Sequence, residues 1–155
     1  MTIASRLQNL GITLPPAGVA AAANYVPYVL QGNILIIAGQ ITIENGEKKF
    51  IGQVGKEFSV DEGKAAARLC AVNILGQISA ALGGDLERVE RIMRLGVFVS
   101  CAPDFTEQSA VGNGASDLMV EVFGDAGRHA RAAVGVSSLP FGVAVEVDAM
   151  VAIKN

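Results

Sequence analysis

Arg131 is the residue whose type and surroundings most clearly predict the binding of an anion. Strand periodicity places it on one face with Ala133 and Gly135. Because these neighbours are very small, they leave room above the sheet for a ligand or for a neighbouring subunit. A guanidinium in that position presents a planar fork that can hold a carboxylate through two hydrogen bonds.

Glu146 is the acidic residue that the sequence pattern places opposite Arg131. Residues 131–136 and 143–153 have the pattern of two strands of a final hairpin. A turn near residues 138–139 would bring Arg131 and Glu146 together. The pair has a second interpretation, a cross-strand ion pair that only decorates the sheet. Spacing alone favours this second interpretation, because structural pairs of this kind are common.

Other chemical groups are sparse in this sequence. The single histidine, His129, excludes a histidine-rich metal site, and the distant Cys70 and Cys101 do not form a zinc motif. The spacing of acidic residues is not that of an EF-hand, and no nucleophile elbow, phosphate loop or dinucleotide fingerprint is present. We therefore expect no cofactor and no metal, and any reaction must be intrinsically easy.

The composition predicts a single domain that works as part of an oligomer. Of the 155 residues, 51% are hydrophobic and 17% are charged, and the mean hydropathy is +0.43. A domain of this size cannot bury so much apolar surface alone. The apolar stretches are too short to span a membrane, and the N-terminus lacks the features of a signal peptide. We expect a cytoplasmic homo-oligomer with no membrane segment and with reduced thiols.

The charge balance argues against nucleic acid as a partner. Twelve basic and 15 acidic residues give a net charge of −3. Proteins that bind nucleic acid usually carry a basic patch or stripe, and none is visible along the chain.

The elements that would position these residues follow from periodicity and from end signals. Ser59 opens a capping box before the first long helix, and Asp104 is predicted to open a second one. Asn45 and Gly46 indicate a hairpin. Helices are expected at residues 2–10, 59–82 and 104–123; strands at 25–30, 34–43, 48–51, 89–101, 131–136 and 143–153; and a connector at 12–23. This order predicts an α+β fold, with two long helices on one face of a mixed sheet and an apolar, uncovered second face.

Two separated motifs resemble those of one known family. The C-terminal motif runs from His129 through Arg131, the Leu139-Pro140 pair and Glu146, and the N-terminal motif joins residues 25–32 to 37–41. Both are similar to the signatures of the YjgF/RidA family, also called L-PSP endoribonuclease-like, in a longer subgroup. Under this resemblance, residues 1–24 form an N-terminal extension of helix and connector, and residues 25–155 form the family domain.

The resemblance implies a chorismate-mutase-like fold and a homotrimer with clefts between its subunits. The family's best-known activity is the hydrolysis of reactive enamines and imines, such as 2-aminoacrylate and 2-iminopropionate, to a keto acid and ammonia. By analogy, Arg131 would grip the substrate carboxylate and Glu146 would hold the attacking water. Tyr28 would line the cleft, and Gly39 lies in the matching second-strand motif. Such a reaction needs orientation and proton transfer only.

Two departures from the family pattern, and the position of His129, concern the expected cleft. Ala133 stands where many members carry cysteine, so only its backbone carbonyl can serve a substrate. The segment 111–117 is longer than in typical members, which makes Asn113 and Asp117 expected lining residues. His129 precedes Arg131 by two residues and lies either at the cleft rim or in an exposed loop.

Three functional hypotheses follow. The leading one is an imine/enamine deaminase, a hydrolase acting on a small carboxylate-bearing molecule. The second is a non-catalytic ligand-binding or chaperone-like trimer, and the third is an RNA-acting translation inhibitor, which the acidic balance disfavours.

Overall fold

The computed structural model describes residues 1–16 and 23–155. The alanine-rich part of the predicted connector, residues 17–22, lies outside these residues. The elements of the described chain are α1 (Ile3–Asn9), β1 (Tyr28–Gln31), β2 (Ile34–Ile41), β3 (Ile43–Glu44), β4 (Glu47–Lys48), α2 (Val60–Ala81), the 3-10 turn η1 (Leu86–Arg88), β5 (Val89–Ser100), α3 (Gln108–Phe123), η2 (Gly124–Gly127), β6 (Ala130–Val136), η3 (Pro140–Gly142) and β7 (Val145–Ile153).

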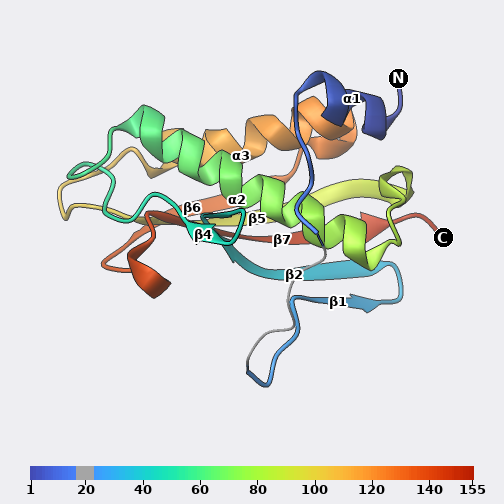
Figure 1. Ribbon diagram of the computed structural model, residues 1–155, viewed down its shortest axis with the longest axis horizontal. Helices are drawn as coiled ribbons and strands as arrows, with labels where there is room; N and C mark the ends of the chain where they lie inside the picture. The colour runs from blue at the N-terminus through green and yellow to red at the C-terminus, as the bar shows by residue number, and fades with distance from the viewer. Residues whose placement is uncertain (17–22) are drawn as a thin grey trace.

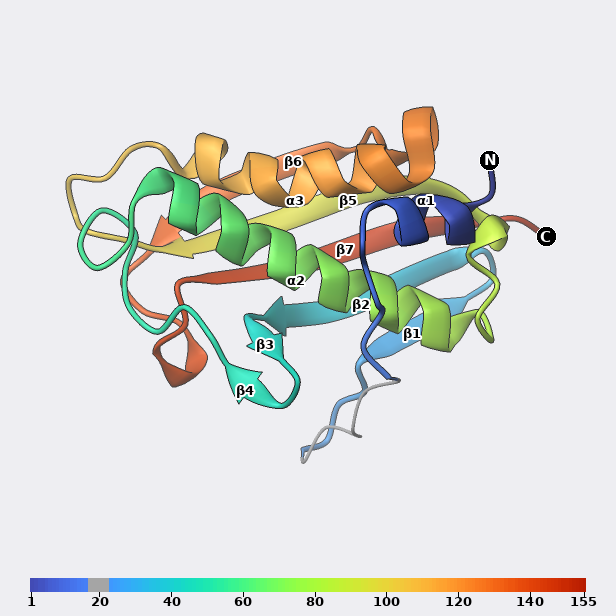
Figure 2. The same ribbon diagram turned by 45° about the horizontal axis from the view of Figure 1, so that its top comes forward.

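A five-stranded mixed sheet carries the two long helices on one face (Figure 1). Its strand order is β1-β2-β7-β5-β6, in which only β5 and β6 run parallel to each other. Turned by 45°, α2 and α3 are seen crossing the sheet side by side (Figure 2). The predicted α+β class, with helices on one face of a mixed sheet, is confirmed.

The two long helices begin in different ways. The predicted capping box at Ser59 is confirmed, because its hydroxyl accepts from the Glu62 amide and the Glu62 carboxylate accepts from the Ser59 amide. The second predicted capping box is wrong. Residues 102–105 form a turn in which the Phe105 amide donates to the Ala102 carbonyl, so α3 begins only at Gln108 and has no side-chain cap.

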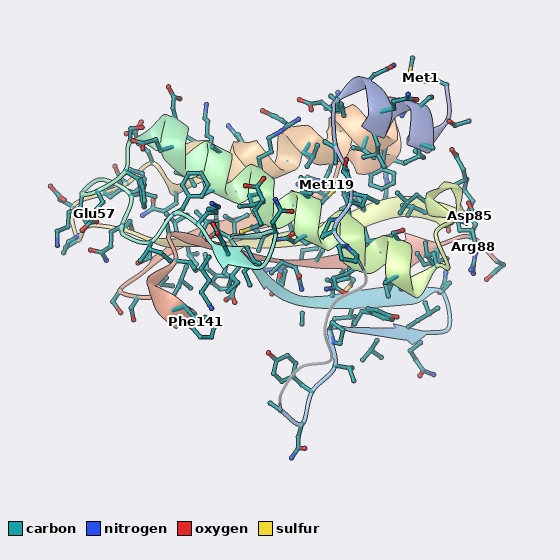
Figure 3. The ribbon with its side chains drawn as sticks, in the orientation of Figure 1. Met1, Glu57, Asp85, Arg88, Met119 and Phe141 are labelled. Atoms are coloured by element: carbon teal, nitrogen blue, oxygen red, sulfur yellow. The ribbon has the colours of Figure 1, made fainter. Side chains whose placement is uncertain are left out.

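The predicted final hairpin is also wrong. β6 pairs with β5, not with β7, and the two paired strands are parallel. A parallel pair needs a long crossover connection, and α3 provides it. β7 lies between β2 and β5. The segment between β6 and β7 is therefore a wide connection rather than a tight turn, and it contains Phe141 with a positive φ of 59°. Figure 3 shows Phe141 on the side of the molecule away from the two helices.

The two faces of the sheet differ in what covers them. On the covered face, beneath the helices, Leu35, Leu95 and Val147 are fully or almost fully buried among α2 and α3. On the open face, the apolar residues Ile36 and Val134 are about half exposed, at 50% and 46%. Apolar side chains are thus exposed on this face, as predicted, but the charged Glu146 and Asp148 of β7 lie on it as well.

The N-terminal helix belongs to the same hydrophobic core. Ile3 and Leu7 of α1 are buried in it, and the Arg6 guanidinium donates to the Val122 carbonyl near the end of α3 at 2.9 Å. The positive charge there suits the partial negative charge of the helix C-terminus. No helix of the described chain is long and apolar enough to cross a membrane.

Candidate functional site

Arg131 on β6 reaches across the covered face to the outer side of α3. Its guanidinium donates to the Asn113 Oδ1 at 3.0 Å, to the Ser116 Oγ at 3.1 Å, and to both the carbonyl and the hydroxyl of Ser109 at 3.0 and 2.9 Å. These four residues, Arg131, Ser109, Asn113 and Ser116, are called the Arg131 cluster below. The guanidinium can lie this close to α3 because Gly112 has no side chain; a Cβ there would lie 3.0 Å from Arg131 Nη1.

The charge of Arg131 has no counter-ion within the described part of the chain. All its hydrogen-bond acceptors are neutral oxygens, and no carboxylate lies within ion-pair distance of it. Its Nε also has no acceptor among residues 1–16 and 23–155. The side chain is partly exposed, and Ser109 and Asn113 are exposed. A solute carboxylate can therefore bind the Nε–Nη2 edge by replacing the Ser109 hydroxyl.

His129 lies beside this cluster rather than in a free loop. Its Nε2 is 2.8 Å from the Ser116 Oγ, and its Nδ1 is 2.6 Å from the Gly127 carbonyl oxygen. Burial lowers the pKa of His129; the bond to Gly127 opposes this effect, and the positive charge of Arg131 adds to it. The imidazole is therefore neutral at pH 7.

Glu146 lies on the open face, next to Gly39. A Cβ at position 39 would come within 2.8 Å of the Glu146 Cδ, so only glycine leaves space for this carboxyl group. The β-bulge between Ile37 and Gln40 places Gly39 there. Burial raises the pKa of Glu146, and the nearby charge of Asp148 raises it further. A carboxyl group with a raised pKa is suited to proton transfer near neutral pH.

The prediction that Arg131 and Glu146 face each other is wrong. Arg131 pairs with Leu95, whose side chain is buried on the covered face, whereas Glu146 pairs with Phe98. Because successive side chains of a strand alternate between faces, the two charged groups point to opposite sides of the sheet. β5 also separates their strands, by about 10 Å in total.

The remaining predicted site residues divide between these two regions. Asn113 belongs to the Arg131 cluster, and Ala133 lies on the covered face, partly buried against the core. Tyr28 pairs with the buried Ile37 and packs against the core, apart from Glu146. Asp117 is exposed and makes no hydrogen bond or ion pair with other described residues.

Sequence reasoning did not identify Ser109 and Ser116. Their spacing relative to Asn113, at i, i+4 and i+7, puts all three on one helical face and could have identified them. The contact of His129 with Ser116 could not have been predicted from the sequence, because the path of the chain through η2 determines where the imidazole points. Among residues 1–16 and 23–155, no group of three His, Cys, Asp or Glu side chains could hold a metal ion.

This fold and these motifs belong to one family. Residues 4–150 match the family model described as "YjgF/chorismate_mutase-like, putative endoribonuclease". The chain belongs to this YjgF/RidA family, as its two motifs predicted.

Three known proteins are similar to this chain over most of its length. Protein TCP17 of Trypanosoma cruzi is 54% identical over 99% of this chain and 95% of its own. The crystal structure of Atu1372 from Agrobacterium tumefaciens is 50% identical, covers 98% of this chain and 92% of its own, and has a TM-score of 0.92. RidA from the Antarctic bacterium Psychrobacter is 29% identical, covers 86% of this chain and 92% of its own, and has a TM-score of 0.58. The N-terminal region is thus shared with the first two relatives.

Proposed function

We propose that this protein hydrolyses reactive imino or enamino acids to keto acids and ammonia. The observation that carries the proposal is the uncompensated guanidinium of Arg131, partly exposed and held only by neutral acceptors. Membership of the YjgF/RidA family and the likeness to a protein named RidA support it.

In this proposal Arg131 binds the substrate carboxylate through Nε and Nη2. The imine carbon is already electrophilic, so the protein has to position a water molecule and move protons. The Glu146 carboxylate takes a proton from the water as its oxygen attacks that carbon. The resulting carboxylic acid gives that proton to the nitrogen, which completes a carbinolamine. The carboxylate then takes the proton of the new hydroxyl group and passes it to the amine, so that the C–N bond breaks as the C=O bond forms and ammonia and the keto acid are released.

The proposal requires more than one copy of the chain. Arg131 and Glu146 of one protomer lie on opposite faces of its sheet, so one small substrate cannot touch both. We therefore propose a homotrimer in which Arg131 faces Glu146 of the partner subunit across a cleft. The half-exposed apolar side chains of the open face, Ile36 and Val134, support burial of that face against another copy.

The direct test measures ammonia release from 2-iminopropionate generated in situ. The wild-type protein should accelerate release over buffer, and Arg131→Ala should remove the acceleration, because about 10²-fold or more in kcat/KM is expected from two charge-assisted hydrogen bonds. Asp117→Asn is the matched control, since Asp117 contacts none of these groups. No acceleration with imines from several amino acids would rule out the proposal.

A second function, ligand binding without turnover, is favoured by one observation. All four Nη hydrogens of Arg131 already have acceptors within the chain, a satisfied state that suits a reversible sensor. A binding protein would show a higher Tm with pyruvate but no ammonia release from any imine tested.

A further inference from the structure

The hydrogen bonds around Ser116 have only one consistent direction. A carbonyl oxygen can only accept, so the Gly127 carbonyl fixes the proton of neutral His129 on Nδ1. The lone pair of Nε2 therefore faces Ser116, and the Ser116 hydroxyl must donate to it at 2.8 Å. Arg131 Nη1 in turn donates to the Ser116 oxygen at 3.1 Å.

This direction gives Ser116 the surroundings of an activated nucleophile. A base lies within hydrogen-bond reach of the hydroxyl, and a third group, the Gly127 carbonyl, holds that base in the required tautomer. The guanidinium of Arg131 favours negative charge on the Ser116 oxygen. Burial keeps His129 unprotonated at neutral pH and thus ready to accept a proton.

Asn113 completes the set of groups. Because Arg131 Nη1 can only donate, the side-chain oxygen of Asn113 must face it, and the Asn113 amide nitrogen must point away. Asn113 precedes Ser116 by three residues on α3, so the two side chains lie on the same face of the helix. The exposed amide group can donate to the oxyanion that forms on the carbonyl oxygen of an ester attacked by Ser116.

We propose that Ser116 and His129 form a nucleophilic site that accepts acyl groups from activated esters carrying a free carboxylate. The Ser116 oxygen attacks the ester carbonyl carbon while its proton passes to His129 Nε2. Asn113 stabilises the oxyanion, and Arg131 holds the free carboxylate through its Nε–Nη2 edge.

The remaining steps balance as an ordinary ester hydrolysis. The bond from the carbonyl carbon to the leaving oxygen breaks, and the alcohol leaves with the proton from His129. Water then attacks the acyl-serine, giving a proton to His129 as it does so. Ser116 recovers its proton, and the products are a carboxylic acid and an alcohol.

The test uses two p-nitrophenyl esters with the full-length protein, the monosuccinate and the neutral butyrate. The monosuccinate should give a burst of p-nitrophenol of up to one equivalent per chain, and mass spectrometry should locate the acyl group on Ser116. The burst with butyrate should be slower by about tenfold or more, because it lacks the charge that Arg131 binds.

Two variants and one control separate the nucleophile from other reactive groups. Ser116→Ala and His129→Gln should each reduce the burst rate by about 10²-fold or more, since glutamine can hydrogen-bond but cannot take the proton. Ser138→Ala, which alters an exposed serine outside the cluster, should react like the wild-type protein.

The burst rate should also fall as the pH drops through the lowered pKa of His129. The groups known to face His129 are Ser116 of α3, Arg131 of β6 and the Gly127 carbonyl of η2. Of these, only Arg131 is charged. Acylation of another residue, or an undiminished burst in Ser116→Ala, would overturn the proposal. Equal rates with both esters would overturn the preference for a carboxylate.

Discussion

The Arg131 cluster and the surroundings of Glu146 are built in opposite ways. Arg131 has four hydrogen-bond contacts to neutral groups of α3 and lies on the covered face of the sheet. The Glu146 carboxyl group lies on the open face, makes no side-chain hydrogen bond to a described residue, and has a raised pKa. One region holds a fixed charge in a fixed direction, whereas the other holds a group whose charge can change.

This contrast suggests a division of roles between the two regions. A rigid, uncompensated cation suits recognition of an anion, and a carboxyl group with a raised pKa suits proton transfer. Neither region alone can carry out the proposed hydrolysis, and the sheet separates them within one chain. Experiments that damage one region at a time can therefore test whether both serve one reaction.

The largest effect should come from removing the proton-transfer group. Glu146→Gln should lower kcat for 2-iminopropionate by about 10²-fold or more with KM little changed, because the amide cannot exchange a proton with water. Steady-state kinetics of ammonia release measure both constants. A rise in KM with kcat unchanged would instead place Glu146 in substrate binding.

A matched pair of glycine substitutions should have effects of intermediate size, one on KM and the other on kcat. In Gly112→Ala the new methyl group would lie 3.0 Å from Arg131 Nη1, so the guanidinium must shift and KM should rise about tenfold. In Gly39→Ala the new methyl group would lie 2.8 Å from the Glu146 Cδ, so the carboxyl group must shift and kcat should fall about tenfold.

The control for this pair is the stability of each variant. Gly112 lies inside a helix, where alanine is favoured, and Gly39 does not have a positive φ. Thermal unfolding should therefore show no large loss for Gly112→Ala. If both variants changed the same kinetic constant, the division of roles would be wrong.

The smallest effect should be a shift in the pH profile. The charge of Asp148 helps to raise the pKa of Glu146, so Asp148→Asn should lower that pKa. Because the carboxylate form takes the proton from water, activity is lost as the pH falls through this pKa, and the acid limb should move to lower pH. Arg94 forms an ion pair with Asp148 at 3.5 Å and remains as a neighbouring cation in the variant. An unchanged acid limb would mean that another group controls it.

The sequence predicted the elements well, but it did not predict how the last strands pair. Helical periodicity and the Ser59 capping box correctly predicted α2, because both depend on residues close together in the chain. The pairing of β6 with β5 depends on α3 acting as a crossover, which adjacent strand patterns cannot reveal. The predicted contact between Arg131 and Glu146 followed from that false hairpin and was lost with it.

The candidate site was predictable to a similar degree. The motif identified Arg131 and Glu146 as residues of interest. Asn113, predicted as a cleft-lining residue, accepts a hydrogen bond from Arg131, and its part in binding a substrate stays a prediction. The roles of Ser109, Ser116 and His129 depend on the packing of α3 and η2 against β6. Contacts of this kind are set by tertiary structure, and local sequence patterns do not encode them.

Mixing two inactive variants tests most directly whether the reaction uses Arg131 and Glu146 from different protomers. Arg131→Ala and Glu146→Gln proteins, co-expressed in equal amounts and purified together without separating mixed from uniform oligomers, should recover about a quarter of the wild-type rate of ammonia release, because random assembly restores that share of the interfaces. If both residues came from one protomer, every site would lack one of them. Mixed oligomers no more active than either variant alone would contradict a site shared between subunits.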